Sequence, residues 1–420
     1  MSAPALGTAA TALRRVRTAA GELVDVHIGP TGVVESLAPP SPAPVADGEL
    51  ELPGWVVLPA AVEPHAHLDK AFSWAASRAP YGDLLSAITA WRAYARELTV
   101  EEIRGRARHA LTRYLAAGIT AVRSHVDVLS DAADPLCGVR ALLELREELE
   151  DVLDLQVCLL GGTLADTATL ERALDLGVDV LGGCPHLADD PVAETTRLLD
   201  LAERRGIAVD LHTDEQLNPD MLSIRELAAQ VRRRGLTQRV TASHCVSLGS
   251  LGSAALADVL AEVRDAGLAV VTLPITNLYL QGWGSAAPVP RGLPALRELL
   301  AAGITVAAGG DNVRDPFNPV GRADPFETTS LLITAAHLDA DQALHAVTGA
   351  GREVLGLPRA GPVPGALADL VVVCADDVTD VLAGAGGSRL VLRRGRVVAA
   401  TTVDRRTAAD PSPVSSRRSG

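Results

Sequence analysis

Lysine is almost absent from this 420-residue chain: Lys70 is the only one, and every other residue among the 38 basic positions is arginine. Basic residues are also outnumbered by 52 acidic ones, which gives a formal net charge of -14. Most of the surface would therefore repel a polyanion, and nucleic acid is excluded as an expected partner. The shortage of lysine also limits the chemistry that an amine side chain could provide.

Paired cysteines and long apolar runs are absent as well. The five cysteines are scattered, without a C-x-x-C pair or the spacing of a disulfide framework. No run of about 18 apolar residues occurs, and the first residues, MSAPALGTAATALRR, lack the basic start and apolar core of a signal peptide. We expect a soluble cytoplasmic protein with reduced thiols and no membrane association.

Short apolar runs alternate with amphipathic stretches from Trp55 to about Ala350. The amphipathic stretches have helical spacing, and many end at a glycine suited to a helix C-cap. The alternation predicts a parallel sheet covered by helices on both faces, and eight such units predict a (β/α)8 TIM barrel over 55–359. The candidate strands are 55–65, 119–128, 154–160, 178–186, 207–215, 239–245, 268–276 and 304–312.

The two flanks have a different pattern. Residues 1–54 and 360–405 contain short strand-like runs between Pro and Gly turns, without convincing helices. We predict that the two flanks pair into one small β-sandwich domain. Residues 406–420 are rich in Pro, Ser and Arg, a composition that predicts a disordered tail.

Histidines and one aspartate interrupt the apolar strands near their C-terminal ends. His65 and His67 form an H-x-H motif, and residues two apart on an extended segment point the same way. His212, His244 and Asp311 end the fifth, sixth and eighth strands. A lone histidine in such a strand is more often a hydrogen-bonded core residue, but five such groups on one rim predict a site for Zn²⁺ or Fe²⁺.

Other polar residues near the strand ends are candidates for catalysis and substrate binding. Glu215 stands three residues beyond His212, and we interpret it as the general acid/base; the alternative is a carboxylate at a helix N-terminus. Gln281 is the best candidate for reading an amide group, whereas Lys70 either pairs with a carboxylate and shapes the pocket or contacts substrate. His125 and His186, at the ends of strands two and four, either contact substrate or hold a loop. The other candidates for the pocket are Trp283, Asn312, Asp315 and Phe317.

Six motifs, in order through nearly the whole barrel, resemble the cytosine deaminase branch of the amidohydrolase superfamily. The flanking β segments are also similar to the sandwich domain of that superfamily, and the last motif is long and specific to the family. The motifs are PHAHLDK (64–70), RSHVDV (123–128), HTDE (212–215), ASHC (242–245), LQG (280–282) and GGDNVRDPFNPVG (309–321).

The resemblance implies one metal ion held by His65, His67, His212 and Asp311, with an activated water as the fifth ligand. It also implies catalytic roles for Glu215, which would protonate a ring nitrogen, and for His244 and Asp311, which would orient the water and take its proton. The reaction would expel ammonia or an amine.

Two further features bear on the number of metal ions and on the substrate. Binuclear amidohydrolases commonly use a carboxylated lysine at the end of strand four, but strand four here ends in CPH, so we expect one ion per subunit. Cytosine deaminases are expected to carry a glutamine after strand three, where this chain has Gly161 and Gly162. The family's second acidic residue after strand eight is here Asn312. Because the amide-reading side chain is missing, cytosine itself is a doubtful substrate.

The preferred hypothesis is a metal-dependent hydrolase that removes an amino group from a small nitrogen heterocycle, such as a pyrimidine or a related base. One alternative uses the same centre to hydrolyse a cyclic amide or an N-alkylamino heterocycle. Another is a binding-only protein on the same barrel, which the intact set of candidate residues disfavours. The sequence is compatible with a homo-oligomer and does not fix the oligomeric state.

Overall fold

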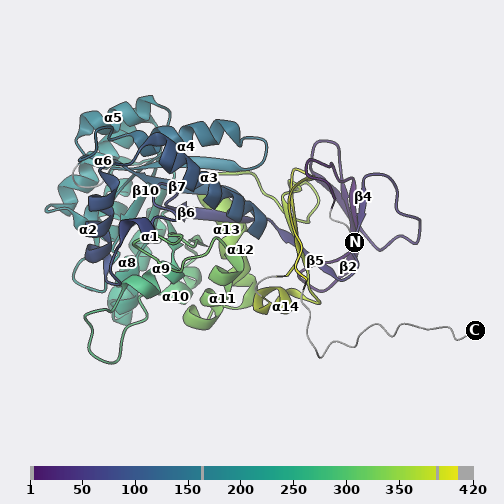
Figure 1. Cartoon of the computed structure of the whole chain (residues 1–420). Coiled ribbons are helices and arrows are strands. Elements are labelled where there is room, and N and C mark those ends of the chain that lie inside the picture. The colour runs from purple at the N-terminus through teal and green to yellow at the C-terminus, as the bar shows by residue number, and fades with distance from the viewer. Residues whose placement is uncertain (1–3, 162–164, 385–386, 405–420) are drawn as a thin grey trace, which may run out of the picture.

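The computed structural model describes residues 4–161, 165–384 and 387–404. Two eight-stranded β-sheets organise this part of the chain, one forming a helix-covered barrel and the other lying at its side (Figure 1). Gly162 and the predicted tail, 406–420, lie outside the described residues. Within the described residues, no helix combines the length and the apolar character that a membrane crossing requires.

The first sheet confirms the predicted (β/α)8 barrel. Its strands are all parallel and follow one another in chain order from β6 to β13. A parallel bridge between Ala66 and Asp311 brings the first strand beside the segment that follows the last. The strands are β6 (Ala61–Ala66), β7 (Ile119–Asp127), β8 (Asp154–Leu160), β9 (Val180–Gly183), β10 (Ala208–Thr213), β11 (Val240–His244), β12 (Ala269–Thr272) and β13 (Val306–Ala308).

The barrel helices form where the sequence has helical spacing and capping residues. In α3, residues Ile103, Ala107, Ala110, Leu111 and Tyr114 are buried on one face, Thr99 caps the first turn, and Gly118 ends the helix. The helices after the first strand are α1 (Trp74–Ser77), α2 (Leu84–Ala95), α3 (Val100–Ala117), α4 (Cys137–Glu148), α5 (Thr167–Asp175), α6 (Pro191–Arg205), α7 (Ser223–Arg234), α8 (Ser253–Asp265), α9 (Pro274–Leu280), α10 (Leu296–Ala301), α11 (Pro325–Ala336), α12 (Ala340–Val347) and α13 (Gly349–Leu355), with short 3-10 turns η1 (Pro185–Leu187) and η2 (Val246–Ser250).

The segment 55–65, expected as one barrel strand, is divided at Ala60. Its first half is β5 (Trp55–Pro59), which pairs antiparallel with β14 (Leu370–Cys374) in the second sheet, and its second half is β6. The Ala60 amide donates to Asp369 O, just before β14 of the second sheet. The next amide, that of Ala61, donates to Gly118 O, just before β7 of the barrel. The apolar run is continuous because both halves are buried.

Three other barrel strands are much shorter than the sequence predicts. The segment 178–186 is a strand only over Val180–Gly183, because Pro185 begins the 3-10 turn η1. The segment 268–276 is a strand only to Thr272, because Pro274 begins α9 and cannot donate to a strand ladder. The segment 304–312 is a strand only over Val306–Ala308, and the chain then turns through two glycines to Asp311.

The second sheet is mixed and is built from both flanks, with β5 between them. The order is β16-β15-β14-β5-β1-β2-β3, and β4 pairs with β1. Val371 and Val373 of β14 face a cluster with α11 and α14 (Val378–Ala383), a short helix that the sequence analysis missed, whereas Leu370 and Val372 face the opposite cluster. The other strands are β1 (Ala12–Arg17), β2 (Leu23–Ile28), β3 (Val34–Ala38), β4 (Glu49–Glu51), β15 (Arg389–Arg393) and β16 (Arg396–Thr401).

Candidate metal centre and active site

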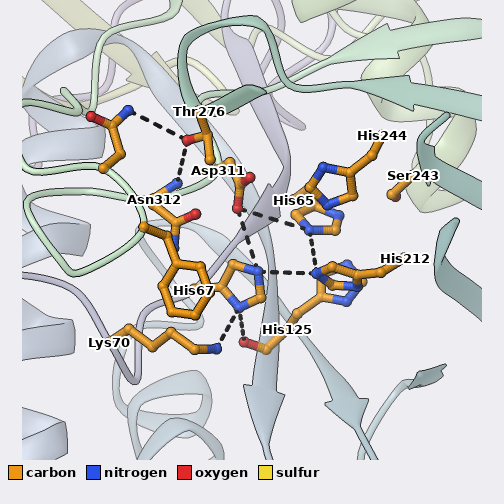
Figure 2. Close-up of polar contacts among 12 residues, drawn as sticks. His65, His67, Lys70, His125, His212, Ser243, His244, Thr276, Asp311 and Asn312 are labelled. Carbon is orange, nitrogen blue, oxygen red and sulfur yellow. Dashed lines mark hydrogen bonds and ion pairs between the residues drawn. The ribbon is translucent and has the colours of Figure 1, made fainter. Parts of the chain in front are cut away.

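Three histidine rings meet at the C-terminal end of the barrel (Figure 2). The Nε2 atom of His212 lies 3.1 Å from Nε2 of His65 and 3.2 Å from Nε2 of His67. Two nitrogen ligands bound at 2.0–2.1 Å in a tetrahedral zinc site are separated by about 3.3 Å. Both distances from His212 are therefore those expected between ligands of a single ion.

Asp311 completes this group from the segment that follows β13. Its Oδ1 atom lies 3.4 Å from His67 Nε2 and 4.0 Å from His65 Nε2. Asp311 adopts a positive φ of 63°, which aspartate tolerates better than most residues. Among the described residues, neither carboxyl oxygen accepts a hydrogen bond, although the side chain is buried. A buried carboxylate without hydrogen bonds is costly, and a bound cation would offset that cost.

Burial lowers the pKa of His65, His67 and His212 well below the usual value, with neighbouring positive charges adding to the effect. Neutral imidazole is the form that binds metal. His67 Nδ1 lies 3.1 Å from the carbonyl oxygen of His125, and donation of its hydrogen there would leave the Nε2 lone pair free for the ion. Burial also disfavours the charged form of Asp311 and raises its pKa well above the usual value. A bound cation would favour the charged carboxylate, so the residues present fit one divalent cation.

His244 ends β11 beside this group, with a positive φ of 72°. Its Nδ1 atom lies 3.1 Å from Asn277 Nδ2 on α9 and 3.5 Å from Glu215 Oε1. Its Nε2 atom has no hydrogen-bond partner among the described residues. One ring nitrogen from each of His244, His65 and His212 lies within 4.8 Å of the other two, so His244 belongs to the same group of side chains.

Glu215 lies in the loop after β10, beside His244. Burial raises the pKa of its carboxyl group to about 8, against a smaller lowering by the charge of Lys70. The group is therefore mainly protonated at neutral pH and could donate a proton. The carboxylate at the start of α7 is the neighbouring Asp214, which accepts hydrogen bonds from the amides of Ser223 and Ile224. Glu215 does not occupy the helix N-terminus that the alternative interpretation required.

Lys70 lies under the same centre, and its ammonium group forms ion pairs with Asp127 and Asp69. Its Nζ atom lies 2.8 Å from Asp127 Oδ1 and 3.0 Å from His67 Nδ1. Burial opposes its charge, but Asp127 and Asp69 more than offset this and raise its pKa. Asp127 also accepts a hydrogen bond of 2.6 Å from Trp91 Nε1, so the ammonium group is held in one position.

A cavity of about 280 Å³ opens onto the centre. Its inner end is lined by His67, His212, Glu215, His244 and Asp311, and its outer part by α2 and by residues 128–132. Gly161 also lines it, at the place where the family pattern has a glutamine, so the described residues present no amide side chain there.

The sequence candidates for substrate binding fall into three groups. Lys70, Asn312 and Phe317 line the cavity. Trp283 is 51% exposed, and its indole donates to the carbonyl of Tyr279 away from the centre. The others lie behind the cavity wall. His125 stacks on His65, with the ring centroids 3.8 Å apart, and His186 Nδ1 lies 3.0 Å from His212 O. Gln281 donates to Glu215 O, and Asp315 accepts a hydrogen bond from Asn312 Nδ2.

Several residues that support the centre were missed by the sequence analysis. Arg123 donates at 2.7 Å to Asp210 Oδ2, and Asp210 Oδ1 accepts from Ser243, beneath the histidines. The sequence did offer a signal for this pair, because Arg123 and Asp210 are each a charged residue inside an apolar strand. Trp91 and Asn277 carried no signal, because both lie on helices and reach the site only through the tertiary fold.

Comparison with known proteins agrees with this geometry. A model of the amidohydrolase family matches residues 93–399.

The chain belongs to the amidohydrolase family.

As an amidohydrolase it acts on carbon–nitrogen bonds other than peptide bonds, and the predicted resemblance is confirmed. A pterin deaminase of Rhizobium rhizogenes is 32% identical over 381 residues, covering 87% of this chain and 86% of the relative. The structure of a 5-methylcytosine deaminase from Klebsiella pneumoniae liganded with 5-fluorocytosine superposes with a TM-score of 0.85 at 28% identity, over 94% of this chain and 99% of the other. The structure of an N-isopropylammelide isopropylaminohydrolase from Burkholderia multivorans superposes with a TM-score of 0.78 at 30% identity, over 93% of this chain and 98% of the other.

Proposed function

We propose that this amidohydrolase removes an amino group from a small nitrogen heterocycle, with one Zn²⁺ or Fe²⁺ ion held by His65, His67, His212 and Asp311. The observation that carries the proposal is a group of three imidazole Nε2 atoms, two of them beside a buried carboxylate that accepts no hydrogen bond within the described residues. When bound, the ion would supply a water activated for nucleophilic attack at neutral pH.

The side chains around the centre would move the protons of this reaction. Asp311 accepts the proton of the attacking water, and His244, whose ring is held by Asn277 and Glu215, orients that water. Glu215, with its pKa raised to about 8, donates a proton to the ring nitrogen next to the carbon under attack. The oxygen of water replaces the amine at that carbon, and the carbon–nitrogen bond breaks. The amine leaves with the proton that Asp311 took from the water, and the remaining hydroxyl proton returns to Glu215 as the ring carbonyl forms.

Substrate contact is proposed for the three candidates that line the cavity. The fixed ammonium of Lys70 would donate to an oxygen or nitrogen on the ring, and Asn312 and Phe317 would contact its edge and face. His125, His186, Gln281 and Asp315 are proposed to position the centre from behind. Trp283 is given no substrate contact in this proposal, because its side chain is 51% exposed and does not line the cavity.

The lining of the cavity favours a base other than cytosine. Gly161 lines the cavity and provides no amide group at the position of the expected glutamine. The relative named as a pterin deaminase is consistent with a bicyclic amino-oxo base of this kind. Removal of an N-alkylamino group by the same centre is the second candidate, supported by the similarity to N-isopropylammelide hydrolases.

Product analysis of the metal-loaded full chain tests these candidates. We expect pterin to be turned over with release of ammonia, and cytosine to be turned over more slowly. Isopropylamine released from N-isopropylammelide would instead support the second candidate, and a ring-opened acid would indicate cyclic-amide hydrolysis. No turnover of any of the three compounds after loading with Zn²⁺ or Fe²⁺ would contradict the proposal.

A further inference from the structure

One wall of the cavity is a single face of α2. Leu84, Ile88, Trp91 and Ala95 repeat at helical spacing along this wall, and all four carry apolar or aromatic side chains. Figure 1 shows α2 at the end of the molecule farthest from the mixed sheet. The wall has a buried part, where Trp91 contacts Asp127, and a partly exposed part with Leu84 and Ile88.

Arg92 lies on the same face of α2 and also lines the cavity. It is exposed, and within the described part of the chain its guanidinium makes no hydrogen bond or ion pair. Most other arginines of this acidic chain pair with a carboxylate or a carbonyl oxygen. An arginine left without a protein partner on an otherwise apolar wall is available to an anion on a ligand.

The charges around Arg92 are few. Arg96, one turn further along the helix, lies 4.0 Å from Asp131, and both side chains are more than half exposed. Lys70 and Asp127 compensate one another at the inner end. Among the described residues, Arg92 is therefore a positive charge in the cavity lining without an ion pair, although the whole chain has a formal charge of -14.

We propose that Arg92 is the anchor of an outer subsite for a carboxylate carried by the heterocyclic substrate, on the side of the ring away from the amine that leaves. The inference rests on the proposed function for the orientation of the ring. The amine faces the histidines and Glu215, the ring lies between Trp91 and Phe317, and the carboxylate reaches the guanidinium. Ile88 and Leu129 line the path between the two ends.

Two pairs of compounds test the subsite: pterin against pterin-6-carboxylate, and cytosine against cytosine-5-carboxylate. In the wild-type chain we expect the carboxylate to lower KM, and Arg92→Met to raise KM for the carboxylated member about 5- to 10-fold while changing the uncharged member less than about twofold. Arg92→Lys should restore part of the difference, because a lysine keeps the charge but loses the planar fork. Arg297→Met, which removes an exposed arginine outside the cavity, is the matched control and should change neither compound.

Calorimetric binding of pterin-6-carboxylate to the full chain separates this inference from the proposed function. Turnover of pterin-6-carboxylate with a KM that rises in Arg92→Met supports both the outer subsite and the deaminase assignment. Turnover of both members without any effect of Arg92→Met overturns the subsite and leaves the deaminase assignment standing. Binding that weakens in Arg92→Met without turnover supports the subsite and overturns the deaminase assignment. Neither binding nor turnover overturns both.

Discussion

At the scale of single residues, the centre depends on polar atoms that the protein itself leaves without partners. Asp311 is buried with both carboxyl oxygens free of hydrogen bonds among the described residues, and the Nε2 atoms of three neutral histidines face it. Such an arrangement is unfavourable without a cation and favourable with one. Metal affinity should therefore depend on each of these side chains.

Replacing Asp311 or His212 by alanine should remove the metal and the activity together. Loss of one ligand from the centre should lower bound Zn²⁺ or Fe²⁺, measured by plasma mass spectrometry, and reduce turnover at least about 10³-fold. His345, exposed on α12, gives the matched control, and His345→Ala should retain both. Full metal content and full turnover in Asp311→Ala would show that the centre is wrongly assigned.

Glu215 gives the centre a pH dependence with a defined sign. The raised pKa of about 8 means that the carboxyl group is protonated below that pH and loses its proton as pH rises through it. A reaction that needs the protonated form should therefore lose kcat/KM above about pH 8. Glu215→Gln should lower kcat about 10²- to 10⁴-fold without changing metal content. A profile that keeps rising past pH 9 would contradict the role of proton donor.

At the scale of elements, the barrel strands carry a buried ion pair under the metal centre. Arg123 of β7 and Asp210 of β10 are 1% and 0% exposed and lie 2.7 Å apart, and the guanidinium also donates to Gln156 Oε1 and Val354 O. His125, stacked on His65, lies 3.5 Å from the same carboxylate. The pair thus joins two strands that are not neighbours in the sheet, beneath the histidine rings.

Breaking this pair should cost far more than breaking a surface pair. Arg123→Met leaves Asp210 buried without its counter-charge, and we expect the free energy of unfolding to fall by about 3–5 kcal/mol in urea titrations. Arg140→Met removes an arginine whose pair with Asp134 is 45% and 38% exposed, and it should cost less than about 1 kcal/mol. Equal losses in the two variants would refute the importance of burial here.

At the scale of the whole molecule, the mixed sheet is fixed to the barrel by residues from both. Arg389 of β15 donates to Ala117 O at the end of α3 and to Asp324 before α11. Arg393 of the same strand bonds to Asp154 at the start of β8. These contacts reach the N-terminal side of the barrel strands, opposite the end that holds the histidines.

Removing one of these ties should weaken the fold and spare the chemistry. Arg389→Met leaves the Ala117 carbonyl without that donor, and we expect a loss of about 1–3 kcal/mol in unfolding free energy with KM and kcat unchanged. Arg396→Met gives a comparison in the same sheet, because Arg396 makes only an exposed contact of 3.4 Å to Gly7 O among the described residues. A large change in kcat for Arg389→Met would show that the sheet influences the centre.

The sequence predicted the barrel because buried strands and amphipathic helices leave regular apolar patterns. The division of 55–65 at Ala60 was not predictable, because both halves are buried and the apolar run has no break. The histidines were found from their place at strand ends, and the structure brings them together. Trp91, Arg92 and Asn277 were not found, because helices carry them into the site through contacts distant in sequence.

The position of Lys70 makes it a natural reporter group. The chain carries one lysine amine, and that amine is 3% exposed and protonated, between Asp127 and His67. A reagent that acylates amines should therefore modify this side chain only when the cavity opens or the fold is lost. The rate at which one acyl group appears on Lys70, read by peptide mass spectrometry, would time that opening, and a substrate bound over the lysine should slow it.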